Sequence, residues 1–324
     1  MNLTIQTEAQ TERLLLEGKR CTGVQYRVGN EVRTARARRD VVVSCGTIMS
    51  PQLLELSGIG QGERLKGLGI EVKHDLPGVG ENLRDHYAPR TRWEINAPGV
   101  TYNTLAGGWF GLVRQALKYA VSRRGLLGIP AAPVRAFVRS REGLDGPDAL
   151  LGWVPLLYEP GYKISKQSGV TCYAHAMRPE SKGSIHITAP DPGRQPAIRF
   201  NFLADPLDIE VTLAAVRIVR AIMTAPAMQP LQVRELQPGP ETTSDDALLD
   251  WVKAVGETTY HPVGTCKMGQ DPMAVVDERL KVRGIEGLRV ADASIMPTLI
   301  SGNTNAPSIM IGERATDFIL ADAA

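Results

Sequence analysis

Residues 40–60 read DVVVSCGTIMSPQLLELSGIG and predict a strand, a glycine turn and a helix in direct succession. Residues 40–43, in which three valines follow Asp40, have the composition of a buried strand. Ser50 and Pro51 are residue types favoured at a helix N-cap and at the first helical position, and Gly58 suits a helix end. Such a unit holds phosphate-bearing cofactors in many proteins, but many purely structural units share it. The stretch therefore indicates an α/β core and leaves cofactor binding open.

The residues before this unit predict a small antiparallel meander. Short strand patterns alternate with turn signals at Gly18 and at Gly29-Asn30. The expected strands are 3–7, 12–17, 21–28 and 32–37. They lead into the buried strand at 40–43.

Residues 257–269, ETTYHPVGTCKMG, contain the histidine with the strongest case for chemistry. Pro262 restricts the preceding His261 to an extended backbone, which presents the imidazole rather than placing it on a helix. An imidazole with its ordinary pKa of about 6.5 can accept a proton at neutral pH. Taken alone, a histidine beside a proline is more often a packed or turn residue.

Two further stretches add polar groups at the ends of expected elements. Residues 301–307, SGNTNAP, open the helical pattern 308–319, and they place Asn303 and Asn305 where a helix offers free backbone N–H groups. Residues 288–297, LRVADASIMP, predict a short buried strand that ends at Asp292. An aspartate there can cap the next turn or accept a hydrogen bond from a cofactor hydroxyl.

Several of these motifs together resemble the glucose-methanol-choline (GMC) flavin oxidoreductases, in particular their C-terminal active-site half. The motifs are HPVGT at 261–265, GNTNAP at 302–307, the signature-like stretch 46–60 and the loop LPGVGENLRDH at 76–86. The resemblance implies FAD as cofactor and oxidation of an alcohol (a CH-OH donor) by hydride transfer to the flavin.

The resemblance also implies roles for single residues. His261 would accept or orient the hydroxyl proton, and Asn303 would hold the substrate oxygen. The residues expected to bind the cofactor are Gly46, Thr47, Asp292, Ala293, Thr304 and Asn305. No metal site is expected.

One family feature is not found in this sequence. A strict search for G-x-G-x-x-G fails at both glycine clusters, 58–62 and 78–80. In the family this fingerprint lies near the N-terminus. The chain is therefore expected to lack the N-terminal FAD phosphate-binding motif and to resemble roughly the last three fifths of a GMC enzyme.

The expected fold class is α/β with α+β elements. Residues 1–88 would form part of a Rossmann-like FAD-binding domain, 89–255 an antiparallel-sheet substrate domain, and 256–324 a return to the FAD domain. Helical patterns at 109–123, 205–223 and 245–255 fall in the middle segment, the first of them among helices expected to cover the substrate-facing sheet. Strand patterns fall at 179–188 and 196–201.

Composition excludes several protein classes. The 324 residues are 43% hydrophobic and 22% charged, which is typical of a folded globular protein. A net charge of +2 gives no sequence-wide attraction to nucleic acid or anionic lipid. The four cysteines have no C-x-x-C spacing and suit reduced thiols in the cytoplasm, so neither a disulfide nor zinc is expected. No apolar run is long enough for a membrane span.

The sequence leaves three functions open. The first is oxidation of a small-molecule alcohol, with a quinone, an electron-transfer protein or oxygen as the unknown electron acceptor. The second is a non-redox lyase on the same flavin scaffold, because fold and cofactor do not determine the reaction. The third is a truncated, flavin-free and inactive fragment.

Overall fold

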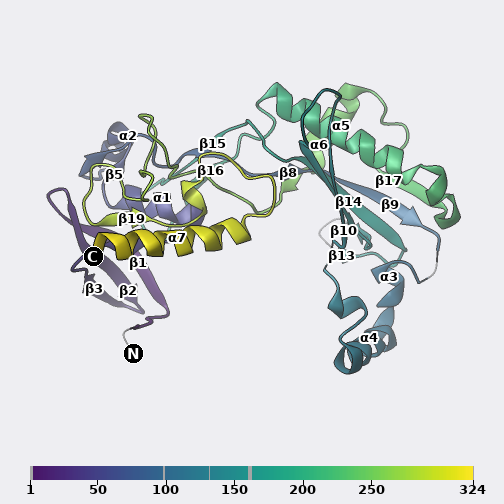
Figure 1. The fold of residues 1–324 in the computed structure, drawn as a ribbon, viewed down its shortest axis with the longest axis horizontal. Helices are drawn as coiled ribbons and strands as arrows, with labels where there is room; N and C mark the ends of the chain where they lie inside the picture. Colours follow the sequence, from purple (N-terminus) through teal and green to yellow (C-terminus); the bar gives the residue numbers. More distant parts are fainter. Residues whose placement is uncertain (1–2, 98, 131, 160–162, 324) are drawn as a thin grey trace. The chain divides into compact units, whose positions relative to one another are not determined.

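The computed structural model describes residues 3–97, 99–130, 132–159 and 163–323, and Figure 1 shows its helices and strands. The chain divides into two compact units. Unit 1 consists of Met1–Asp85, Glu180–Ala204 and Tyr260–Ala324, and unit 2 consists of His86–Pro179 and Asp205–Thr259. The expected α/β fold with an interleaved antiparallel domain is confirmed.

Unit 1 begins with an antiparallel meander in the order β1-β2-β3. Its strands are β1 (Ala9–Glu17), β2 (Arg20–Val28) and β3 (Glu31–Arg36). The strand expected at 3–7 is absent from the described part of this segment, because pairing with β2 begins only at Ala9. Leu3 and Ile5 are exposed as a result.

The strand-turn-helix unit forms as β4 (Val41–Val43) and α1 (Gly46–Leu56), and β4 pairs in parallel with β19 (Leu288–Val290). The prediction of Ser50 as N-cap is wrong, because α1 begins four residues earlier and contains Pro51 in its interior. The early start of α1 depends on Asp292, a residue far away in the sequence. Asp292 accepts hydrogen bonds from the Gly46 N–H and the Ser50 hydroxyl, so the helix is held from its first residue.

Pro51 is tolerated inside α1 because its missing N–H is replaced. A proline cannot donate to the carbonyl four residues earlier, here that of Thr47. The Thr265 hydroxyl donates to this carbonyl instead, at 2.6 Å. Thr265 is fully buried, so the bond satisfies an acceptor that water does not reach.

Four short elements of unit 1 follow α1 in the chain. They are β5 (Ile59–Gly60), α2 (Gly62–Gly67), β6 (His74–Asp75) and β7 (Glu81–Leu83). β7 pairs with β15 (Gly183–His186), which pairs with β16 (Ala197–Arg199). This pairing places residues 180–204 in unit 1, whereas the expected boundaries put them in the middle domain of 89–255.

The C-terminal segment closes the core of unit 1. It contains β19, the short 3-10 helix η3 (Ala293–Ile295) and α7 (Asn305–Ala323), the long yellow helix in Figure 1. Apolar side chains from α1, β19 and α7 pack in one cluster, among them Leu54, Val290 and Ile311.

Unit 2 is built on a five-stranded antiparallel sheet in the order β10-β11-β14-β9-β17. These strands are β9 (Arg90–Ile95), β10 (Val134–Val138), β11 (Ala149–Val154), β14 (Gly169–Ala176) and β17 (Val233–Gln237). Helix α5 (Pro206–Met223) places Val211, Ala215 and Val219 against Trp93 and neighbouring sheet residues.

The remaining elements of unit 2 are short, apart from two helices. Helix α6 (Asp245–Val255) has the predicted bounds, and α4 (Gly108–Ser122) lies within one residue of its predicted bounds. The others are α3 (Tyr102–Leu105), η1 (Leu126–Gly128), η2 (Pro226–Leu231), β8 (Tyr87–Ala88), β12 (Tyr158–Glu159), β13 (Lys163–Ile164) and β18 (Glu257–Thr258). Over the described residues, no helix is both long and apolar enough to cross a membrane.

Candidate active site

His261 is held by its backbone in unit 1, with its side chain only partly buried. Its N–H donates to the Asp85 carboxylate at 2.9 Å, and Asp85 is itself buried. Two residues on, Val263 exchanges backbone hydrogen bonds with Arg84. The backbone around Pro262 is thus tied to Arg84 and Asp85.

Asn303 meets the ring of His261. The Asn303 Nδ2 atom lies 3.0 Å from His261 Nε2, although the two residues are 42 positions apart in the chain. In this orientation the amide donates, and Nε2 accepts as in a neutral imidazole. An amide also carries an acceptor oxygen, so the same side chain can pair with a protonated ring after rotation. The pair therefore suits a histidine that changes its protonation state.

The segment after His261 is fastened to α1. The Thr47 hydroxyl donates to the Pro262 carbonyl at 2.7 Å, and the Thr265 hydroxyl donates to the Thr47 carbonyl. Gly264 has a φ of 96°, and a Cβ there would lie 2.4 Å from the Asn82 carbonyl. A side chain at this position would push the His261 segment away, which explains the glycine in the HPVGT motif.

Asp292 links the end of β19 to the start of α1. One carboxylate oxygen accepts from Gly46 N–H at 2.9 Å and from Ser50 Oγ at 2.6 Å, and the other accepts from Ser294 N–H at 2.8 Å. Asp292 therefore caps η3, as one of the two sequence readings expected, and it also anchors α1. A carboxylate offers about four acceptor positions, so these three donors leave room for a further hydroxyl donor.

The other predicted cofactor residues lie at the starts of three helices, α1, η3 and α7. Thr304 and Asn305 lie at the beginning of α7, where Asn305 is exposed and the Thr304 carbonyl accepts from Ser308. Gly46 has a φ of 79° with no atom within 4 Å of a Cβ built there, and the N-cap residue of α1, Cys45, makes no side-chain cap hydrogen bond of its own. The Ala293 carbonyl accepts from Gly264 N–H at 3.4 Å.

The structure thus joins six of the eight predicted residues into two linked groups of unit 1. His261 and Asn303 form one, and Gly46, Thr47, Asp292 and Ala293 form the other. The Thr47 to Pro262 hydrogen bond connects them. Sequence reasoning missed the anchoring role of Asp85, although this residue lies in the quoted loop 76–86, directly before a histidine.

Three further histidines, His86, His175 and His186, contact residues other than His261 and Asn303. His86 is fully buried, with its Nε2 atom 2.9 Å from the Met177 carbonyl, and its ring packs on that of His175 in unit 2. His186 lies between two carboxylates, 2.7 Å from Glu55 and 2.9 Å from Glu81. Among the described residues, no group of three or more histidine, cysteine or acidic side chains is arranged to hold a metal ion.

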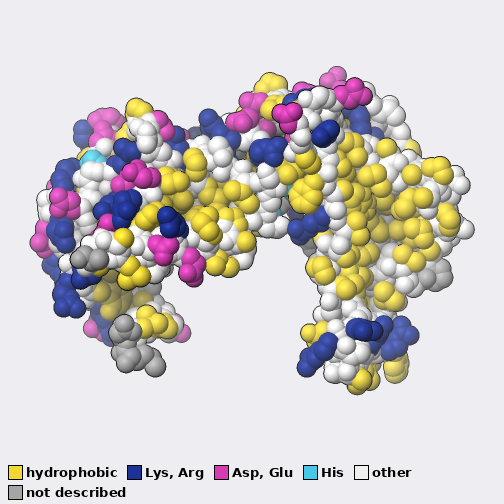
Figure 2. Space-filling view, viewed as in Figure 1, with side chains coloured by type: hydrophobic (Ala, Val, Ile, Leu, Met, Phe, Trp, Pro, Cys, Tyr) yellow, Lys and Arg dark blue, Asp and Glu magenta, His cyan; other side chains and the backbone are white. Residues whose placement is uncertain are grey.

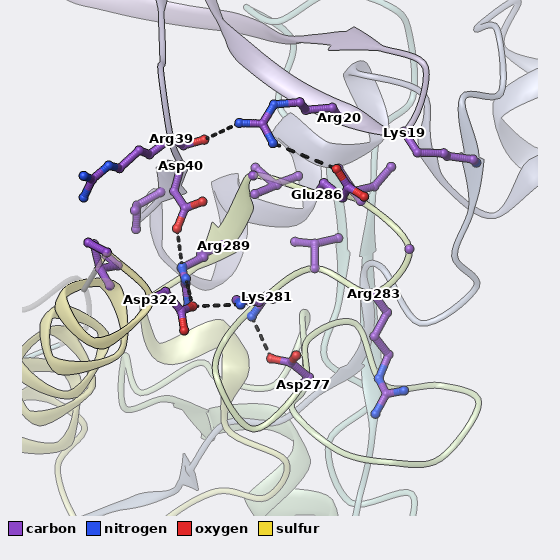
Figure 3. A pocket seen from close by; sticks show the side chains of 18 of the residues that line it. Lys19, Arg20, Arg39, Asp40, Asp277, Lys281, Arg283, Glu286, Arg289 and Asp322 are labelled. Carbon is purple, nitrogen blue, oxygen red and sulfur yellow. Dashed lines mark hydrogen bonds and ion pairs between the residues drawn. The ribbon is translucent and has the colours of Figure 1, made fainter.

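A charged pocket of about 910 Å³ in unit 1 contains none of the predicted site residues. Figure 3 shows its centre, where the buried Arg289 binds Asp40 at 2.7 Å and also Asp322, and where Lys281 pairs with Asp322 at 2.7 Å. These ion pairs connect the start of β4 with the end of α7. The lining as a whole contains seven basic residues and four acidic ones.

Comparisons with known proteins show the family of this chain. Two family models, both described as GMC oxidoreductase, match residues 1–88 and 179–312. The chain is 40% identical over 319 residues to an oxygen-dependent choline dehydrogenase of Chromohalobacter salexigens, and 40% identical over 321 residues to one of Escherichia coli. Each alignment covers 98% of this chain and 57% of the relative, so the chain spans just over half the length of these proteins.

Solved structures of several oxidases are similar in fold to this chain. A formate oxidase has a TM-score of 0.89 and 26% identity, and a variant of the Aspergillus oryzae enzyme, solved to study FAD modification, has the same values. A fungal aryl-alcohol oxidase has a TM-score of 0.83 and 25% identity. Each comparison covers 97% of this chain and 60% of the other.

One expectation from the sequence is corrected by these comparisons. The chain was expected to lack the N-terminal FAD-binding motif, but the N-terminal family model matches residues 1–88. The expectation rested on a strict search for one short glycine pattern. A family domain is defined over a longer stretch, which here includes the meander, β4 and α1.

Proposed function

Because this chain belongs to the GMC oxidoreductase family, we propose that it serves the FAD-dependent oxidation of an alcohol to an aldehyde or ketone. The observation that carries the proposal is the contact between His261 and Asn303, which places a proton acceptor beside an amide that can orient an oxygen. Unit 1 would bind the cofactor and unit 2 the substrate.

The residues of unit 1 fit an anionic, hydrogen-bonding cofactor. At the start of α1 the N-cap residue Cys45 makes no side-chain cap hydrogen bond, Asp292 accepts from the Gly46 N–H, and Gly46 leaves open space; the start of α7 exposes Asn305. Helix starts carry free N–H groups and partial positive charge, which favour phosphate groups and negatively charged ring edges. Asp292 retains acceptor capacity for a hydroxyl. We assign Gly46, Thr47, Asp292, Ala293, Thr304 and Asn305 to FAD on this basis.

The reaction divides between the cofactor and the two side chains. When bound, FAD supplies the acceptor for the hydride that leaves the carbinol carbon. Once the Asn303 amide has turned from Nε2 to the substrate oxygen, His261 takes the hydroxyl proton at Nε2, so that the carbon-oxygen double bond forms as the C–H bond breaks. Asn303 holds the substrate oxygen in line, and rotation of its amide accommodates the protonated imidazole. Asp85 fixes the backbone from which His261 reaches the substrate.

Flavin spectroscopy on the purified protein tests the proposal. We expect the visible absorbance of bound flavin, and bleaching of that absorbance under anaerobic conditions by at least one alcohol. A first panel contains choline and an aryl alcohol, with formate as a non-alcohol comparison, because the relatives act on such compounds according to their names. Admission of air after bleaching then tests oxygen as the electron acceptor.

Two outcomes contradict the proposal. Protein without flavin, even after incubation with FAD, would mean that unit 1 does not bind the cofactor. Flavin that stays oxidised while a substrate is cleaved would indicate a lyase that uses the scaffold without redox chemistry.

A further inference from the structure

Helix α4 in unit 2 exposes the face that an amphipathic helix normally buries. Its apolar side chains are strongly exposed, with Trp109 at 75%, Phe110 at 86% and Val121 at 89%. The other exposed apolar residues of the helix are Leu112, Val113 and Leu117. The sequence predicted an amphipathic helix covering the substrate-facing sheet, but its apolar face is not packed on the sheet.

The exposed residues form one stripe. Trp109, Val113 and Leu117 are spaced by four residues, and Phe110 and Val121 fall beside them on the same side of the helix. Only Gln115 is buried in α4, and it lies about 200° around the axis from Val113 at roughly 100° per residue. Its side-chain oxygen accepts from the Leu126 N–H at 3.4 Å. The helix is therefore attached through its polar side.

The charges around the stripe all have one sign. From residue 95 to residue 141 the chain contains seven basic residues and no acidic one. Four of them, Arg114, Lys118, Arg123 and Arg124, are exposed on α4 or just after it, and within the described residues none of these four pairs with a carboxylate. Figure 2 shows blue and yellow side chains, without magenta, where Figure 1 labels α4.

An anionic lipid surface meets both properties of this face. Tryptophan and phenylalanine enter the boundary between headgroups and acyl chains, while lysine and arginine beside them reach the phosphates. A second copy of the chain would cover the apolar stripe but would bring like charges together. The 15 residues of α4 span about 22 Å, less than the roughly 30 Å of a bilayer core, so the helix would lie on the surface.

We propose that α4 is a membrane-docking helix that binds anionic phospholipid through the stripe Trp109, Phe110, Val113, Leu117 and Val121 and its flanking basic residues. The whole-chain charge of +2 does not reveal this face, because basic and acidic residues elsewhere balance.

Flotation with lipid vesicles tests the proposal on the whole chain. The protein should float with vesicles of equimolar phosphatidylglycerol and phosphatidylcholine, bind pure phosphatidylcholine far more weakly, and lose binding as salt is raised. Tryptophan emission should shift to the blue as Trp109 leaves water. The double variant Trp109→Ser/Phe110→Ser should abolish flotation, and Arg114→Glu/Lys118→Glu should lower partitioning about tenfold or more.

Matched controls keep the test specific. Ile164→Ser removes an apolar side chain of unit 2 that is 65% exposed, and Lys253→Glu reverses an exposed charge on α6. Both controls should float like the unaltered protein. Equal loss of flotation in controls and α4 variants, or no flotation of the unaltered protein, overturns the proposal. Self-association that is lost in the Trp109→Ser/Phe110→Ser variant, without lipid binding, assigns the stripe to a second copy instead.

Discussion

Asn303 and Asn305 are two residues apart at the start of α7, yet the structure gives them different surroundings. Both residues are exposed, but Asn303 lies 3.0 Å from the His261 ring, whereas Asn305 is the first residue of the helix. A sequence reading based on helix capping treats the two amides as equivalent. The proposed function gives substrate orientation to the first and a backbone contribution to the second.

Alanine at each position should separate these roles. Asn303→Ala removes a hydrogen bond to the reacting oxygen and should raise the barrier to flavin reduction by about 1 to 3 kcal/mol, with FAD still bound. Asn305→Ala keeps its backbone N–H and should cost less. Rapid-mixing rates of flavin reduction measure both. Equal slowing, or a larger effect at Asn305, would reassign the catalytic amide.

The candidate site residues could be chosen from the sequence, but the residues that hydrogen-bond to them could not be predicted. Pro262 was the basis for expecting an extended backbone at His261. The Asp85 carboxylate that fixes this backbone lies 176 positions away, and the donors of Asp292 at Gly46 and Ser50 lie more than 240 positions away. Local propensity carries no information on contacts at such separations.

At the scale of elements, α1 shows how a distant side chain replaces a helical hydrogen bond. The Thr47 carbonyl would accept from residue 51 in a regular helix, but Pro51 has no N–H and Thr265 donates in its place. This is also why the start of α1 was predicted wrongly. Pro51 was assigned to the first helical position, where a proline is normally found, although here it lies within the helix.

A double-mutant cycle tests this replacement. Thr265→Val should leave the Thr47 carbonyl without a partner and lower the free energy of unfolding by about 1 to 3 kcal/mol. In a Pro51→Ala background the new N–H can bond to the same carbonyl, so Thr265→Val should cost clearly less. Urea unfolding of the four proteins gives the coupling energy. Additive effects would show that Pro51 and Thr265 do not share this carbonyl.

The end of α7 is held by charge. Hydrogen bonds from Lys281, Arg289 and Arg279 hold the pKa of Asp322 far below its ordinary value of 3.8. An aspartate with a lowered pKa in the folded state stabilises the fold at pH values above its unfolded pKa, and this contribution is lost as the pH falls toward the folded pKa. The contribution of Asp322 is therefore complete at neutral pH.

Asp322→Asn should lower the thermal midpoint at neutral pH, because the buried Arg289 keeps only Asp40 as an ionised partner. The difference between the two proteins should stay constant above about pH 5 and shrink as the pH drops below 3.8. Calorimetry across this range measures it. A difference that is unchanged at low pH would show that the carboxylate charge is not what stabilises α7.

At the scale of the whole molecule, periodicity predicted most elements but not their assignment to units. The pattern at 245–255 matches α6 because a capping serine and an apolar face define it locally. The strands at 183–186 and 197–199 were also expected, but pairing of β15 with β7 draws them into unit 1. Helix α4 was likewise recognised, whereas the exposure of its apolar face depends on tertiary packing.

The central claim is that His261 accepts the substrate proton while hydride passes to FAD. Anaerobic rapid mixing of flavin-loaded protein with an alcohol that bleaches it tests this claim most directly. His261→Ala should reduce flavin about a hundredfold or more slowly than the unaltered protein, the usual loss for a missing general base, with unchanged flavin content. Unchanged reduction per bound FAD, with less flavin retained, would contradict the claim and assign His261 to cofactor binding.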